Sequence, residues 1–389
     1  MAKFNNENAM YNSAEFDEYQ TSKNKAIEEN LSDDRLDEKP ILQFYSKIPM
    51  SRVIIGYASD LHIGGQGTDY ARAKAGLEVL DKFFNGFTII GGDLLDNANQ
   101  LSATSIYSTK ATPSQQILAA TNLLRPFLNN IPFVLGGNHD SAWGNRNKST
   151  NIGPEEVVAN NLKKPFVPYT AVFHIKSLLP NGESKWITVA FAHQIKNVNR
   201  FISFLASKGI YTDAVITEHV HSGLDESNVY VVPKYDKNGI LVDYENKTIP
   251  VLIGKTMQNG SATVYGAVNF FSDSANIKAV LLGWEKNPNY TSNDTKQPKY
   301  NLMVNPFSVL QKDSNKPTMF ANLLLKYYQK PSIKSYKSKL QKESLTKASA
   351  KLSSALADNK NDFENYLNSK KTGKNKSKSL HTEEEENVK

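Results

Sequence analysis

Apolar and polar positions in the first half of the chain follow two periods. Three short runs rich in β-branched and other apolar residues predict buried strands, at residues 52–59, 87–92 and 131–137. Between them, apolar residues at helical spacing predict helices at 69–85 and 113–130. The order strand–helix–strand–helix–strand predicts a layered α/β sheet with right-handed crossover connections.

Expected strands dominate the second half of the chain. The pair Asn238-Gly239 predicts a hairpin turn, because both residues readily adopt positive φ angles. Residues 287–320 are rich in Pro and Asn, so we expect a loop or irregular cap there. The strands are expected at 166–177, 185–193, 213–221, 228–245, 248–257, 263–272 and 277–285, with a helix at 201–211.

The two ends of the chain differ from its middle in charge. Residues 1–40 hold five Lys/Arg and ten Asp/Glu, whereas residues 326–380 hold fourteen Lys and four acidic residues. A lysine-rich tail can attract phosphate polymers, although such a run is more often a solvated face. We therefore expect four parts, namely a disordered acidic leader (1–45), a main α/β domain (46–286), an irregular cap or linker (287–330) and a Lys-rich helical tail (331–389).

The absence of cysteine from the 389 residues excludes disulfides, thiolate zinc sites and cysteine nucleophiles. No apolar run approaches the ~20 residues of a membrane helix. The first thirty residues lack the apolar stretch of a secretory signal. We therefore expect no membrane association and a cytoplasmic location. The Asn- and Lys-rich composition suggests an AT-rich bacterial or phage genome, in which case the location would be the virion or the host cytoplasm.

Polar residues follow the ends of the expected strands. In an α/β sheet the carboxyl ends of the strands face one crevice, so these side chains should converge there. Carboxylates buried together would repel one another and lose hydration, and divalent cations would remove that cost. Mn²⁺, Fe²⁺ and Zn²⁺ accept such imidazole and carboxylate ligands. The residues are Asp60, His62, Asp93, Asp96, Asn138, His139, Asp140, His193, His219 and His221.

The spacing of these groups indicates chelation of two ions. Asp60 and His62 should lie on the same side of an extended segment, because strand side chains alternate, and the same holds for His219 and His221. The candidate ligands outnumber those that one ion takes. We therefore expect two divalent ions about 3.5–4 Å apart, with Asp93 as the bridge.

The motifs DLH, GDLLDN, GNHD, a lone His after a strand and H-x-H, in this order, resemble those of the calcineurin-like metallophosphoesterase superfamily. The similarity spans residues 52–222. It implies a four-layer α/β/β/α sandwich and a phosphoester hydrolase with two divalent metal ions. Mn²⁺ is the expected metal, with Fe²⁺ and Zn²⁺ as alternatives. One ion would be held by Asp60, His62, Asp93 and His221, and the other by Asp93, Asn138, His193 and His219.

The same resemblance implies catalytic roles for three further residues. His139 would act near the leaving oxygen as general acid or transition-state stabiliser, and Asp140 would orient its ring. Asp96 would hold His139 or a ligand in place. A hydroxide activated by the two ions would attack phosphorus in line. The family's usual glycine before H-x-H is Glu218 here, which leaves the backbone path at that position open.

The segments SDLHIGG, GGDLLDNA, GGNHDS and FAHQ are most similar to the SbcD/Mre11-type DNA nuclease branch. This similarity implies hydrolysis of phosphodiester bonds in DNA by an exonuclease-like enzyme, with an ATPase as partner. The motifs GDxxD and GNHD are also found in other branches, so a phosphomonoesterase acting on phosphoproteins or nucleotides stays open. A non-catalytic assembly protein is a third hypothesis, against which the intact set of ligands argues.

Overall fold

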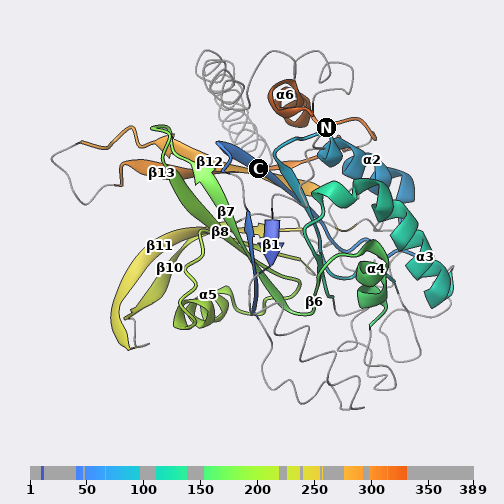
Figure 1. Cartoon of the computed structure of the whole chain (residues 1–389), viewed down its shortest axis with the longest axis horizontal. Coiled ribbons are helices and arrows are strands. Elements are labelled where there is room, and N and C mark those ends of the chain that lie inside the picture. The colour runs from blue at the N-terminus through green and yellow to red at the C-terminus, as the bar shows by residue number, and fades with distance from the viewer. Residues whose placement is uncertain are drawn as a thin grey trace, which may run out of the picture. The chain divides into compact units, whose positions relative to one another are not determined.

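The computed structural model (Figure 1) describes residues 10–12, 41–46, 49–65, 67–96, 111–137, 153–218, 226–236, 240–254, 256, 276–291, 298–312 and 314–330. The chain divides into two compact units, Met1–Tyr328 and Gln329–Lys389, and every helix and strand given below belongs to the first. The helical tail expected over 331–389 and the strand expected over 263–272 lie outside the described residues.

One sheet has six strands in the order β13-β12-β3-β4-β5-β6. Its strands are β3 (Arg52–Ala58), β4 (Gly86–Ile90), β5 (Val134–Leu135), β6 (Phe166–Val167), β12 (Lys278–Lys286) and β13 (Tyr300–Ser308). The strands from β3 to β6 are parallel, and β12 and β13 extend the sheet in antiparallel pairs. The carboxyl ends of β3, β4 and β5 therefore meet at one edge of this sheet.

Helices cover the outer face of the six-stranded sheet and connect its parallel strands. They are α2 (Tyr70–Asp81), α3 (Pro113–Leu124) with a following 3₁₀ turn (Arg125–Asn130), and α4 (Pro154–Leu162), and Figure 1 shows them gathered on one side. The start of α3 is fixed by a capping box in which Thr112 and Gln115 exchange hydrogen bonds. In β3, Gly56 faces α2 so closely that a Cβ there would overlap the side chain of Leu80.

The second sheet has seven strands in the order β1-β2-β7-β8-β9-β11-β10. Its strands are β1 (Met10–Asn12), β2 (Ile41–Ser46), β7 (Thr170–Leu178), β8 (Ser184–Ala192), β9 (Ala214–Thr217), β10 (Glu226–Tyr235) and β11 (Leu241–Ile253). Because β8 and β9 are parallel, the residues that follow them, His193 and Glu218, lie at the same edge of this sheet. The amphipathic helix α5 (Val198–Ser207) connects β8 to β9.

Two hydrophobic cores are built from alternate positions of the strands. The larger core takes side chains from both sheets, such as Phe173 of β7 and Ile55 of β3. The smaller core takes the opposite face of the seven-stranded sheet, such as Val172, together with Leu205 of α5. These contacts confirm the predicted mixed α/β class with two sheets. The four-layer sandwich stays a prediction, as do the domain boundaries.

Two expectations about local secondary structure were wrong. Residues 41–45, assigned to the leader, belong to β2, which pairs with β7 and buries Leu42 and Phe44 completely. Residues 300–308, assigned to an irregular cap, form β13 along the full length of β12. Pro306 is tolerated there because β13 is an edge strand, where a missing N–H breaks no ladder on the open side. A short helix, α6 (Met319–Tyr328), follows.

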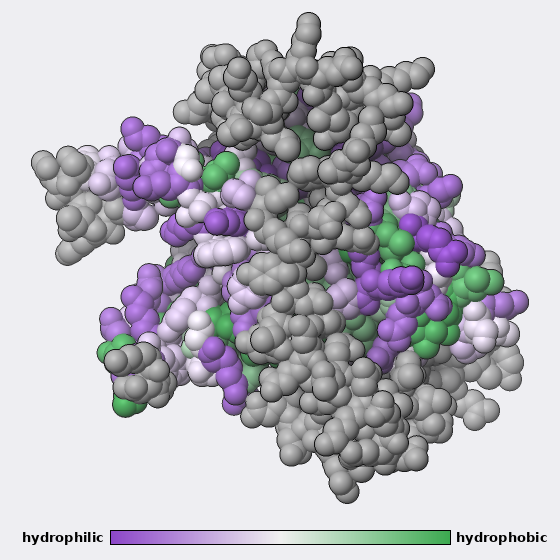
Figure 2. Space-filling view, viewed as in Figure 1, coloured by the Kyte–Doolittle hydropathy of each residue, from purple (hydrophilic) through white to green (hydrophobic). Residues whose placement is uncertain are grey.

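The hairpin of β10 and β11 carries an exposed apolar end. Ile240, Val242 and Tyr244 are each about 60% exposed, and Figure 2 shows apolar surface in this region. The predicted turn residues Asn238 and Gly239 lie outside the described residues, although the two strands pair as a hairpin. Within the described part of the chain, no helix has both the length and the apolar character needed to cross a membrane.

Candidate metal centre

The segments that follow β3 and β4 stay hydrogen-bonded to each other after the strands end. The amide of Asp60 donates to the carbonyl of Gly92 (3.0 Å), and the amide of His62 donates to the carbonyl of Asp93 (3.0 Å). The amide of Asp96 makes a further hydrogen bond between the two segments, to the carbonyl of Ile63 (3.1 Å). This continued parallel pairing holds the two acidic segments side by side.

Left-handed backbone turns, and not strand alternation, bring the first candidate ligands together. Asp60, His62 and Asp93 have φ angles of 48°, 44° and 54°, and Lys163 is the other described non-glycine residue with a positive φ. Each such conformation costs about 1–3 kcal/mol and persists only where the surroundings enforce it. Asp60 and His62 do come together as expected, but the extended segment expected between them was wrong, because both residues have positive φ angles. Strain of this kind concentrates at functional sites.

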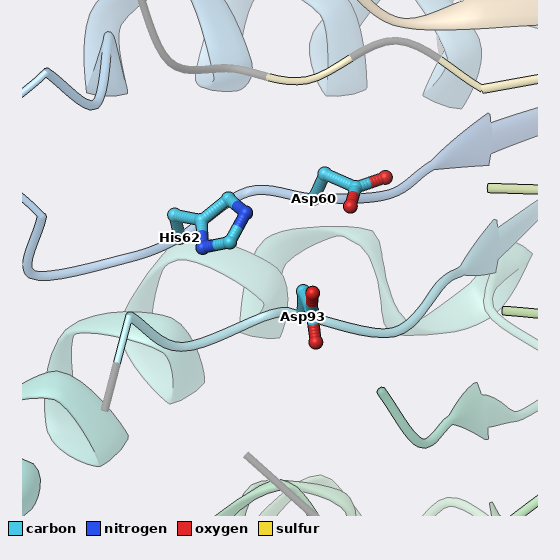
Figure 3. A group of neighbouring side chains, drawn as sticks. All are labelled: Asp60, His62 and Asp93. Carbon is cyan, nitrogen blue, oxygen red and sulfur yellow. The ribbon is translucent and has the colours of Figure 1, made fainter. Parts of the chain in front are cut away.

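The side chains of Asp60, His62 and Asp93 form one buried group. One ligand atom from each lies within 4.8 Å of the others, and the three residues are 0%, 2% and 1% exposed. Figure 3 shows Asp60 and His62 on one segment and Asp93 on the neighbouring segment, each just beyond a strand. Two carboxylate groups and an imidazole fit a divalent cation such as Mn²⁺, Fe²⁺ or Zn²⁺, because these ions accept oxygen and nitrogen ligands together.

His193 and Asp96 extend this group on two sides. The Nε2 atom of His193 lies 3.1 Å from Oδ2 of Asp93, so the end of β8 reaches the segment after β4. The carboxylate of Asp96 lies 4.0 Å from Nδ1 of His62. Burial alone would lower the pKa of His193, but the charge of Asp93 and hydrogen bonds with Asp93 and Glu218 raise that pKa well above its ordinary value.

Glu218, which directly follows β9, turns its carboxylate towards the glycines before Asp93. Its Oε2 atom accepts a hydrogen bond from the amide of Gly92 (3.1 Å) and lies 3.4 Å from Nδ1 of His193. Burial raises the pKa of Glu218 to about 7, although the neighbouring His193 opposes that increase. A side chain at Gly91 would overlap this carboxylate. The sequence signal for this arrangement is the Gly91-Gly92 pair, since glycines at a strand end indicate close approach of another group.

Backbone contacts between glycines bring a third loop to the site. A Cβ at Gly137 would overlap the backbone nitrogen and the carboxylate of Asp93. A Cβ at Gly92 would lie 2.5 Å from Cα of Gly137 and 2.6 Å from Cγ of His193. The segments after β4, β5 and β8 therefore meet in direct contact. The remaining predicted site residues lie outside the described part of the chain, namely Asn138, His139, Asp140, His219 and His221.

Comparison with known proteins gives no family assignment. No family model matches the sequence, and no curated protein matches it. Among solved structures, the calcineurin-like phosphoesterase YfkN from Bacillus subtilis superposes with a TM-score of 0.33 at 10% identity, over 66% of this chain and 91% of that one. A Thermotoga maritima protein solved by solution NMR superposes with a TM-score of 0.26 at 12% identity, over 65% and 99%. Both TM-scores are below 0.5, which is too low to establish fold or activity.

Proposed function

We propose that this chain is a metal-dependent phosphoesterase of the calcineurin-like type. The observation that carries the proposal is the buried group of Asp60, His62 and Asp93, whose ligand atoms approach within 4.8 Å of one another. A purely structural role does not explain why Asp60 and Asp93, which lie close together, are both buried in strained left-handed conformations. Binding of a divalent cation explains both features. A non-catalytic scaffold has no comparable reason to keep them.

Divalent cations held at this group would supply Lewis-acid polarisation of a phosphoryl group and would lower the pKa of water towards neutrality. The chain contributes the ligands and their orientation. Asp60, His62 and Asp93 would hold one ion with His221, and Asp93 and His193 would hold the other with Asn138 and His219. Glu218 lies against Nδ1 of His193 and so fixes its ring with Nε2 towards Asp93.

The residues that follow β5 would complete the catalytic machinery. In our proposal His139 donates a proton to the leaving oxygen, and Asp140 orients the imidazole. Asp96 lies beside His62, a position from which it would hold the ring of that ligand. In this proposal Asp96 and Asp140 orient neighbouring side chains, and His139 alone donates the proton.

We propose DNA phosphodiester bonds as the substrate, with exonuclease-like action. The similarity of the motif sequences to those of SbcD/Mre11-type nucleases supports this choice. The excess of lysine over residues 326–380 also supports it, because phosphate contacts dominate the affinity of proteins for nucleic acid. The ATPase partner and the preference for Mn²⁺ follow from the sequence resemblance alone. We also propose a cytoplasmic location from the sequence alone, or the virion or host cytoplasm if the Asn- and Lys-rich composition reflects a phage genome.

A substrate panel tests the proposal. Purified protein with added Mn²⁺ is incubated with bis(p-nitrophenyl) phosphate, p-nitrophenyl phosphate, linear duplex DNA and single-stranded DNA. An Asp93→Asn preparation made in parallel controls for contaminating phosphatases. We expect turnover of the diester and of DNA. Turnover of the monoester alone would favour the phosphomonoesterase, and a protein that binds no divalent metal and hydrolyses none of the four substrates would refute the proposed function.

A further inference from the structure

Glu155, near the start of α4, is a buried carboxylate whose hydrogen-bond partners include Leu94, the residue after Asp93. It is the second residue of the helix Pro154–Leu162 and is 0% exposed. An acidic residue in the first turn of a helix is stabilised by the partial positive charge of the helix N-terminus. Its place in the first turn is therefore favourable for a buried acidic side chain.

The carboxylate of Glu155 accepts hydrogen bonds from two different loops. The amide of Gly137 donates to Oε2 (2.9 Å) and to Oε1 (3.2 Å). The amide of Leu94 donates to Oε1 (3.4 Å). Leu94 directly follows Asp93, and Gly137 directly precedes Asn138. One side chain thus binds the backbone immediately beside two groups of proposed site residues.

These two amides need an acceptor that the sheet does not provide. Gly137 and Leu94 lie beyond the ends of β5 and β4, where the pairing between these two strands has stopped. A buried amide without an acceptor costs about 1–3 kcal/mol. The backbone of Gly137 lies so close to Asp93 that even a Cβ at Gly137 would overlap it. The loops are consequently in contact, and the carboxylate fixes how they lie against each other.

We infer that Glu155 is a positioning residue that ties the loop bearing Asp93 to the loop bearing residues 138–140. Its carboxylate sets the separation between Leu94, which follows Asp93, and Gly137, which precedes Asn138 in the sequence. The purpose of this tie rests on the proposed function, whereas the tie itself is a property of the fold. Loss of a group that orients metal ligands typically lowers metal affinity by about 10–100-fold.

The test compares two substitutions of Glu155 with a matched control. Glu155→Gln removes the charge and one acceptor oxygen, and Glu155→Asp keeps the charge but shortens the reach by one methylene. Glu78→Gln makes the same chemical change at an exposed position of α2. Three measurements are made on the full chain: hydrogen exchange of the Leu94 and Gly137 amides, Mn²⁺ affinity by calorimetry, and kcat and KM for bis(p-nitrophenyl) phosphate.

We expect both Glu155 variants to exchange the two amides faster, while the rest of the sheet keeps its protection. Mn²⁺ affinity should fall by about 10–100-fold, and kcat should fall more than KM rises. Glu78→Gln should behave as the wild type. If Glu155→Asp keeps full protection and affinity, the helix-terminal charge is what matters and the tie is refuted. A uniform rise in exchange across the whole protein would likewise refute it, as a general stability effect.

The wild-type protein supplies a further check should both variants fail to fold. Its Leu94 and Gly137 amides must then be protected well beyond exposed amides, and fast exchange at both would overturn the inference. The proposed function fails by a different result, namely a wild type that binds no Mn²⁺ and hydrolyses no phosphoester. The exchange data decide the role of Glu155 in either case.

Discussion

The contact between Gly92 and its neighbours makes a sharp prediction about the site. In Gly92→Ala the new methyl would lie 2.5 Å from Cα of Gly137, 2.7 Å from the nitrogen of Gly137 and 2.6 Å from Cγ of His193. Carbon atoms in ordinary contact are about 3.5–4.0 Å apart, so the overlap is about 1 Å on two sides. Gly92 is not among the described glycines with a positive φ angle. The effect of the substitution is therefore steric.

The expected cost is at the upper end of overpacking, about 3 kcal/mol of the free energy of unfolding. A flexible side chain could yield by rotating, but one of the two contacts is backbone and must move as a segment. That movement shifts the loop after β5 away from Asp93, so Mn²⁺ affinity should fall as well. A loss of this size is a large fraction of the 5–15 kcal/mol that stabilises a typical protein.

Gly136→Ala is the matched control. Its methyl would lie 3.1 Å from Cζ of Phe166, 3.2 Å from the carbonyl oxygen of Pro168 and 3.4 Å from Oε2 of Glu155, so shifts of a few tenths of an ångström suffice. We expect a cost below about 1.5 kcal/mol. Urea unfolding in EDTA followed by circular dichroism measures stability, and calorimetry measures Mn²⁺ binding. If Gly92→Ala unfolds within about 0.5 kcal/mol of the wild type and binds Mn²⁺ normally, the contact between these loops does not exist.

Four further outcomes are expected. Asp93→Asn should lower Mn²⁺ affinity in calorimetry by more than the ~10–100-fold cost of losing an outer partner; unchanged affinity would contradict a ligand role. Gly91→Ala should destabilise the wild type but not a Glu218→Ala background, with a coupling of about 1–3 kcal/mol in urea unfolding, because the methyl overlaps that carboxylate; additive costs would exclude the overlap. Burial raises the pKa of Tyr328 to about 12, so the stability that comes from keeping it neutral is complete below about pH 10 and is lost as pH rises through about 12. Tyr328→Phe should lack this loss, and identical alkaline unfolding curves would refute it. Deleting residues 331–389 should spare hydrolysis of small substrates but weaken DNA binding in a salt-dependent manner; gel-shift assays at two salt concentrations check this, and unchanged binding would exclude the tail as a DNA contact.

Local pattern was sufficient for most elements because the hydrophobic periodicity of a strand or helix is carried by its own residues. The strand over Arg52–Ala58 and the helix over Tyr70–Asp81 lie within their predicted ranges. The order of the elements also indicated that Asp60 and Asp93 follow neighbouring parallel strands, and β3 and β4 are neighbours. The residues of the buried group were therefore recognisable from the sequence.

Features that depend on partners distant in the chain were decided by the tertiary structure. The strand β13 forms in a segment rich in Pro and Asn because the edge of β12 supplies its hydrogen bonds. Glu218 contacts Gly92 across 126 residues, and Glu155 contacts Leu94 across 61. The left-handed turn at His62 also depends on its pairing with a neighbouring loop. A sequence pattern records the preference of each residue for its immediate neighbours, whereas the direction of a buried carboxylate is fixed by which distant backbone amides need an acceptor.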